Sequence, residues 1–172
     1  NGVDLFVDGL DFFVLDIRQK IFRYCNEKGI PAMTTAPLGM GAAHLNFLPD
    51  GMSFDDYFGV ETVQGEEKYI KFLIGLAPSM LQRGYVADMS RVDFASRKGP
   101  STPMACELCA GVAGTEALKI LLKRPNVGAA PHGFHFDAYR NKFRWTWRPF
   151  GHKNPLQKLL FGIVKKLVLK HV

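Results

Sequence analysis

The stretch VDLFVDGLD, residues 3–11, combines a hydrophobic run with two carboxylates directly after it. The run is too continuous for a half-exposed edge strand, so we expect a parallel and central strand over residues 4–8. Open α/β sheets bind ligands at the carboxyl ends of such strands. Asp8 and Asp11 therefore stand where the chemistry of an α/β protein is usually found.

The residues that follow predict a β–α–β unit. A helix is expected over residues 13–28, where apolar residues recur at helical spacing: Val14, Ile17, Ile21, Tyr24 and Cys25. Gly29 supplies a C-terminal cap and Pro31 prevents continuation of the helix, before a second strand at residues 32–35. A unit of this length implies a right-handed crossover between parallel strands.

The rest of the chain alternates between regular and irregular segments. We expect a strand over residues 42–48, antiparallel to its predecessor, and a long, partly helical excursion over residues 49–101. Thr102 and Pro103 are typical of a helix start. This helix is expected to reach residue 122, with a core face of Ala117, Leu118, Ile120, Leu121 and Leu122. Two strands, 133–138 and 142–147, and a basic amphipathic helix over 154–172 complete the prediction.

Composition limits the class of protein. A chain of 172 residues with 47% hydrophobic residues fits one soluble α/β domain. Residues 138–172 hold nine Lys and Arg but no acid, so the net charge of +6 describes a basic tail on a mildly acidic body, and no nucleic-acid partner is predicted. Three cysteines and no apolar run of about 20 residues favour a cytoplasmic protein.

Four motifs in order resemble the ThiF/MoeB/HesA adenylyltransferases, relatives of the ubiquitin-activating enzymes. In those proteins a strand ends in D-x-T-D-N, a helix carries Arg and Cys, a G-x-P strand follows, and a later helix has the pattern G-V-x-G-x-x-A-x-E-A-x-K-x-L. The matching positions here are residues 8–11 (DGLD), Arg18, Cys25, residues 29–31 (GIP) and residues 111–121 (GVAGTEALKIL).

The resemblance implies the C-terminal half of a Rossmann-like fold, in which parallel strands continue into antiparallel ones with helices on both faces. It also implies ATP-dependent activation of a carboxylate as an acyl-adenylate, on a ubiquitin-like or sulfur-carrier protein or a small carboxylate, by a homodimer. Asp11 corresponds to the residue that holds Mg²⁺, with Asp8 and Gly9 beside it at the nucleotide. From the residues alone, Asp11 could equally cap the following helix, and both roles can hold together.

Two departures from the family pattern stand out. Phe12 occupies the position after the second Asp, where the family usually has Asn. The family's glycine-rich phosphate loop is missing, and Gly39-Met40-Gly41 does not replace it, because a phosphate loop must open a helix. We therefore expect residues 1–172 to be one ThiF-type domain fragment without its N-terminal nucleotide-binding half, inactive alone. The alternative is a degenerate ThiF-fold interaction module without nucleotide chemistry.

The pair Cys106 and Cys109 suggests half of a zinc site, because structural zinc needs four ligands. The excursion 49–101 holds no cysteine, which also argues against a thioester relay there. His132 and His135 could complete a Cys₂His₂ set, but their spacing from Cys109 is outside the familiar range. Zinc is therefore disfavoured, and small residues on a closely packed helix are the preferred interpretation.

The C-terminal helix leaves two interpretations. Its apolar stripe comprises Leu156, Leu159, Leu160, Ile163, Val164, Leu167 and Val168, with the lysines beside it. Docking of this stripe on the protein itself or on a partner subunit is favoured. An interfacial helix on anionic lipid is the second interpretation, and membrane contact is not expected because the stripe holds no Trp.

Overall fold

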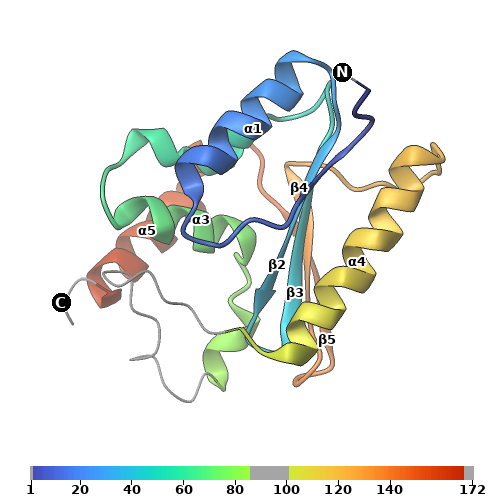
Figure 1. The fold of residues 1–172 in the computed structure, drawn as a ribbon. Helices are drawn as coiled ribbons and strands as arrows, with labels where there is room; N and C mark the ends of the chain where they lie inside the picture. Colours follow the sequence, from blue (N-terminus) through green and yellow to red (C-terminus); the bar gives the residue numbers. More distant parts are fainter. Residues whose placement is uncertain (1, 86–100, 169–172) are drawn as a thin grey trace.

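In a computed structural model, which describes residues 2–85 and 101–168, helices cover both faces of a five-stranded sheet (Figure 1). The strands, in spatial order, are β1 (Phe6–Asp8), β2 (Ala32–Leu38), β3 (Gly41–Phe47), β4 (His132–Asp137) and β5 (Lys142–Trp147). β1 and β2 are parallel, and every later pair is antiparallel. The predicted α/β class, with parallel strands continuing into antiparallel ones, is confirmed.

The helices divide unequally between the two faces. They are α1 (Leu15–Glu27), α2 (Phe54–Phe58), α3 (Glu67–Leu76), α4 (Pro103–Leu121) and α5 (Pro155–Val168), with short 3₁₀ turns η1 (Val60–Thr62), η2 (Leu81–Gly84) and η4 (Gly151–Lys153). α4 lies along one face, against β2 and β3, while α1, α2, α3 and α5 gather on the other side (Figure 1). The predicted helices and strands are thus present, and residues 86–100 of the excursion lie outside the described part of the chain.

Aromatic rings fill the core between the sheet and the group of α1, α2 and α3. The ring of Phe54 lies 4.6 Å from the rings of both Phe22 and Phe58, and Phe58 lies 4.9 Å from Phe72. Gly75 of α3 makes this packing possible, because a Cβ there would come within 2.4 Å of the Phe58 ring. The core therefore holds α1 and α3 on the same side of β1.

The expected central position of the first strand is wrong for the described sheet. β1 pairs only with β2, and Val7 is 46% exposed. Phe6 points inward and packs edge-on against Phe22 at 5.5 Å. The run of apolar residues thus splits into one inward and one outward side chain, as the alternation of any β-strand requires, and the outward face at Val7 is uncovered.

The buried face of α1 also differs from the predicted one. α1 buries Leu15, Arg18, Phe22 and Cys25, whereas the predicted core residues Ile17 and Tyr24 are exposed. The cause is Arg18, whose guanidinium turns toward the loop before the helix and fixes the rotation of α1.

α4 begins as predicted but shows a different core face. Thr102 is its N-cap, with Oγ1 accepting from the Ala105 N–H, and Pro103 follows. Leu118, Leu121 and Leu122, expected in the core, are exposed, while the buried residues are Ala105, Cys109 and Glu116. Ala117 and Ile120, also expected in the core, are half-buried. Glu116 is held on the buried side by a hydrogen bond from Asn46 Nδ2, and the three leucines lie on the exposed side.

α5 lies within the predicted helix of residues 154–172, of which residues 169–172 and the side chains of Leu167 and Val168 are outside the described part, and it shows only part of the predicted docking. It packs on α3, where Lys165 Nζ pairs with Glu67 Oε1 at 2.6 Å. Within the predicted stripe, Leu160 and Val164 are half-buried, but Leu156, Leu159 and Ile163 remain exposed. Nothing in the described part of the chain covers these three side chains.

Candidate functional site: the loop after strand β1

The loop of residues 9–13 lies at the carboxyl end of β1. Asp8, the last residue of β1, pairs in register with Thr34, and β2 continues beyond that point to Leu38. The loop therefore sits beside the projecting end of β2, where open α/β sheets bind ligands. The Phe12 side chain packs the loop against α3: the centre of its ring lies 5.3 Å from that of Phe72 and 6.3 Å from that of Tyr69.

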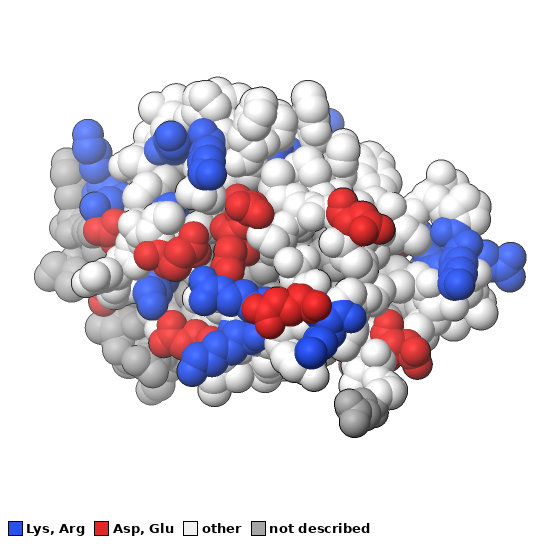
Figure 2. Space-filling view, turned by 90° about the horizontal axis from the view of Figure 1, so that it is seen from above, with Lys and Arg blue, Asp and Glu red and all other residues white. Residues whose placement is uncertain are grey.

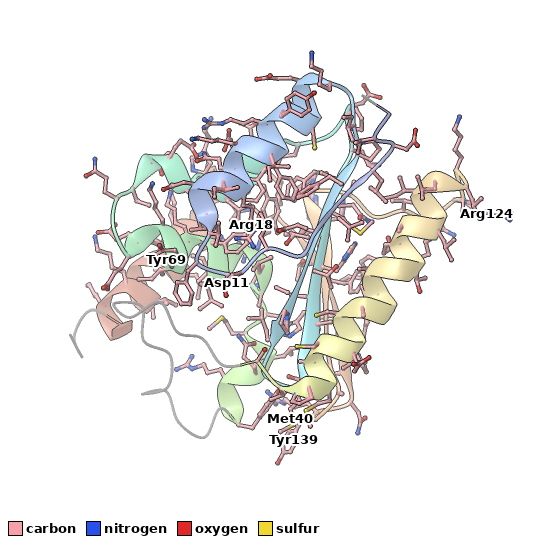
Figure 3. The ribbon with its side chains drawn as sticks, in the orientation of Figure 1. Asp11, Arg18, Met40, Tyr69, Arg124 and Tyr139 are labelled. Atoms are coloured by element: carbon pink, nitrogen blue, oxygen red, sulfur yellow. The ribbon has the colours of Figure 1, made fainter. Side chains whose placement is uncertain are left out.

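Arg18 holds the shape of this loop. Its Nη2 donates to the carbonyls of Leu10 at 2.6 Å and Asp11 at 3.0 Å, and its Nη1 donates to the Phe12 carbonyl at 3.3 Å. The guanidinium carbon also lies 4.8 Å from the centre of the Phe72 ring. One buried side chain thus satisfies three backbone carbonyls of the loop. Figure 3 shows Arg18 close to Asp11.

Asp8 is buried and fully engaged. Its Oδ2 accepts from Arg18 Nε at 2.6 Å, and its Oδ1 accepts from the Leu10 N–H at 3.1 Å. Both oxygens therefore serve the loop itself, and the carboxylate does not face solvent. Asp8 thus orients the loop in this structure, whereas the family resemblance places it beside the nucleotide.

Asp11 is exposed at the outer turn of the loop. Its Oδ1 accepts from the Phe13 N–H at 2.9 Å, and its carbonyl accepts from the Val14 N–H at 3.1 Å. The N-cap of α1 is Val14, without a side-chain cap, so Asp11 does not cap the helix; it stabilises the turn before it. Within residues 2–85 and 101–168, Oδ2 makes no hydrogen bond, which leaves this oxygen open to a cation.

Gly9 and Phe12 complete the loop in opposite ways. Gly9 is exposed, and a Cβ at its position would meet nothing within 4 Å. Phe12 is half-buried and contributes its ring to the core cluster instead of presenting a polar group at the surface. Phe12, which stands where the family usually has Asn, thus packs the loop against α3.

The cysteines and histidines do not form a metal site in the described part of the chain. There, no group of three or more His, Cys, Asp or Glu is placed to hold a metal ion. His132 and His135 lie three residues apart on β4 and point to opposite faces of the sheet, so they cannot complete one site with Cys109. Burial raises the pKa of the Cys109 thiol to about 12 and also raises the pKa of Cys25, which makes both poor nucleophiles.

Sequence reasoning missed a buried polar network under α4. His44 Nδ1 lies 2.8 Å from Thr35 Oγ1 and its Nε2 lies 3.0 Å from Asn46 Oδ1, while Asn46 Nδ2 donates to Glu116 at 2.9 Å. Burial lowers the pKa of His44 to about 4. The alternation of polar residues in the strand GAAHLNF was the available signal, but the same alternation is typical of any strand.

A second missed cluster fixes the turn between β2 and β3. The Tyr85 hydroxyl donates to Asp137 Oδ2 at 2.6 Å and accepts from the Met40 N–H at 2.8 Å. Burial and the hydrogen bond to Asp137 raise the pKa of Tyr85 to about 12. Thr102 Oγ1 donates to the Gly39 carbonyl at 2.9 Å, so the start of α4 is tied to the same turn.

The sequence matches one family model over residues 1–159, which is described as the ThiF family. The chain belongs to the ThiF family. The match covers the loop of Asp8 and Asp11, the whole sheet and the first turn of α5. A search of the curated proteins finds no match.

Solved structures with the same fold include those of MccB from E. coli. The structure of MccB with succinimide matches with a TM-score of 0.53 and 13% identity, covering 88% of this chain and 38% of MccB. The structure of MccB with ATP matches with a TM-score of 0.52 and 13% identity, covering 90% and 40%. At this identity the likeness shows the ThiF-like fold alone, and the chain spans about two fifths of the length of MccB.

Proposed function

We propose that this chain carries the metal-holding half of an ATP-dependent adenylyltransferase site, with Asp11 as the Mg²⁺ ligand. The observation that supports it is an exposed carboxylate with one free oxygen, on a loop that Asp8 and Arg18 hold rigid at the carboxyl end of β1. Mg²⁺ on a nucleotide usually takes one or two carboxylates together with phosphate oxygens and water. Asp11 fits that need, and Gly9 leaves room for the nucleotide to approach.

The proposed reaction joins a substrate carboxylate to AMP. A carboxylate oxygen forms a bond to the α-phosphorus of ATP, the α–β phosphoanhydride bond breaks, and pyrophosphate leaves. Mg²⁺, when bound, screens the phosphate charge. The chain's own contribution is to place Asp11 and to keep it in position, because catalysis of this kind depends on positioning and on electrostatic stabilisation.

We infer that residues outside these 172 supply the remainder of the nucleotide site. Two observations support this: the chain spans only 38–40% of the length of MccB, and β1, a parallel strand, has a single neighbour in the described sheet. Calorimetric titration with MgATP provides the test. The complete protein is expected to bind and residues 1–172 alone are not; micromolar binding by residues 1–172 would contradict the proposal.

The substrate class and the assembly are extensions of this proposal. One MccB structure was solved with AMPCPP and MccA, and a ubiquitin-like or sulfur-carrier protein or a small carboxylate would serve the same chemistry here. A homodimer is supported by the exposed aromatic row of β5, comprising Phe143, Trp145 and Trp147. Free thiols at all three cysteines support a cytoplasmic location.

One observation favours a second function, that of an interaction module without nucleotide chemistry. Phe12 places an apolar ring in the core at the position where the family has a polar residue. The two functions differ in ATP-dependent pyrophosphate exchange by the complete protein, which a module would lack.

A further inference from the structure

α5 carries an uncovered apolar ridge. Leu156 is 75% exposed, Leu159 is 63% exposed and Ile163 is 47% exposed. Their spacing of three and four residues places them on one side of the helix. The opposite side, which includes Gln157 and Val164, faces the protein. Docking on α3 thus uses one side of α5 and leaves the ridge free.

Exposed lysines lie near the ridge in the described part of the chain. Lys153, Lys158 and Lys166 are exposed, and residues 138–172 contain no acid. Of the elements that pack on α5, η4 has no acidic residue, and α3 offers Glu67, which already pairs with Lys165. In contrast, acidic and basic side chains lie interspersed on the face shown in Figure 2.

We propose that α5 binds an anionic lipid surface, with Leu156, Leu159 and Ile163 in the headgroup–acyl boundary. Lys153, Lys158 and Lys166 then contact the lipid phosphates. An amphipathic helix with a lysine-rich polar side and an apolar side lies in the membrane interface in this way. Phe150, 73% exposed just before η4, adds an aromatic group near the same end of the helix.

A second copy of the chain fits this ridge less well. Pairing two identical ridges would bring their lysines together, and like charges in contact weaken an interface. A stable interface also buries about 800 Å² on each partner, more than three side chains offer.

The ThiF match ends at residue 159, so most of α5 lies beyond it, and the inference does not rest on the proposed adenylyltransferase activity. No helix in the described residues is long and apolar enough to cross a membrane, so α5 would lie on the surface.

Co-sedimentation of the complete protein with lipid vesicles tests this inference. The vesicles contain phosphatidylcholine alone or phosphatidylcholine mixed with phosphatidylglycerol, at physiological ionic strength and at about 1 M salt, where charges are screened beyond about 3 Å. We expect binding only to the mixed vesicles and its loss at high salt. Each change among Lys153→Gln, Lys158→Gln and Lys166→Gln is expected to weaken partitioning about fivefold.

One triple variant and one double variant separate the ridge from other exposed leucines. Leu156→Ser with Leu159→Ser and Ile163→Ser is expected to weaken binding at least about a hundredfold. Leu118→Ser with Leu122→Ser, on α4, is the matched control and is expected to bind as the unmodified protein does. Absence of binding to the mixed vesicles, or binding that survives the ridge variant, would overturn the inference. So would a change from dimer to monomer in the ridge variant with no effect on vesicle binding.

Discussion

Arg18 Nε lies 2.6 Å from Asp8 Oδ2, and both side chains are almost completely buried. The same guanidinium donates to the carbonyls of Leu10, Asp11 and Phe12. The ion pair and the shape of the loop are therefore one unit. The buried Asp8–Arg18 pair therefore holds the loop in the shape that exposes the Asp11 carboxylate.

Replacing Arg18 is expected to cost far more stability than replacing an exposed arginine. Arg18→Met leaves Asp8 buried without its partner, which typically costs about 3–5 kcal/mol. Arg23, which pairs with Asp55 on the surface, is the matched control, and Arg23→Met is expected to cost about 0–1 kcal/mol. Urea unfolding of both variants measures the difference; equal midpoints would show that the buried pair does not hold the loop.

The His44 network predicts a loss of stability on acidification. The pKa of His44 is lowered to about 4 in the folded protein, below its ordinary value of 6.5, because burial disfavours the imidazolium. Above the ordinary pKa, the ring is neutral in both states and no stability is lost. As the pH falls from 6.5 toward 4, the unfolded chain binds a proton that the folded protein refuses, so stability declines.

Between pH 7 and about pH 5 this effect is expected to amount to about 2 kcal/mol. The measurement is the urea midpoint at both pH values for the unmodified protein and for His44→Gln. Burial also lowers the pKa values of His135 and His152, so a pH dependence will remain in the variant but should be smaller. An identical pH dependence in the two proteins would refute the assignment to His44.

Phe12 is expected to act through packing. Phe12→Asn removes a half-buried ring from Phe72 and Tyr69, with a cost of about 2 kcal/mol, below the ~3–5 kcal/mol of a fully buried Phe. Phe12→Leu, which keeps an apolar side chain, should cost less. Thermal unfolding measures both, and pyrophosphate exchange by the complete protein should not rise in Phe12→Asn. A faster exchange in that variant would mean that Phe12 marks lost chemistry.

The positions of the strands along the chain were predictable because their signals are local, but the place of β1 at the edge of the described sheet was not. Gly29 and Pro31 end the helix before β2, and the polar turn at residues 139–141 joins two clearly alternating strands. The loop of Asp8 and Asp11 was also predictable, because the end of a hydrophobic run fixes where the carboxylates emerge.

The faces of the helices were not predictable, because tertiary partners decide them. Arg18 lies on the buried face of α1 only because Asp8 and three carbonyls receive it, and helical spacing alone favoured Ile17. On α4 the buried position goes to Glu116, because Asn46 and Lys119 donate to its carboxylate, and Leu118 lies on the exposed side. An arginine on the side of a helix that should face the core was the signal for a buried acidic partner, and Asp8 at the end of β1 is that partner.

The most direct test of the central proposal is MgATP-dependent pyrophosphate exchange by the complete protein carrying Asp11→Asn. Asp16→Asn is the matched control, an exposed carboxylate on α1 that pairs with Lys68. Asp11→Asn is expected to lower exchange at least about a hundredfold with an unchanged thermal midpoint, because a charge that holds the metal is lost while the turn can still form. Near-normal exchange in Asp11→Asn, at the level of Asp16→Asn, would contradict the assignment of Asp11 as the metal ligand.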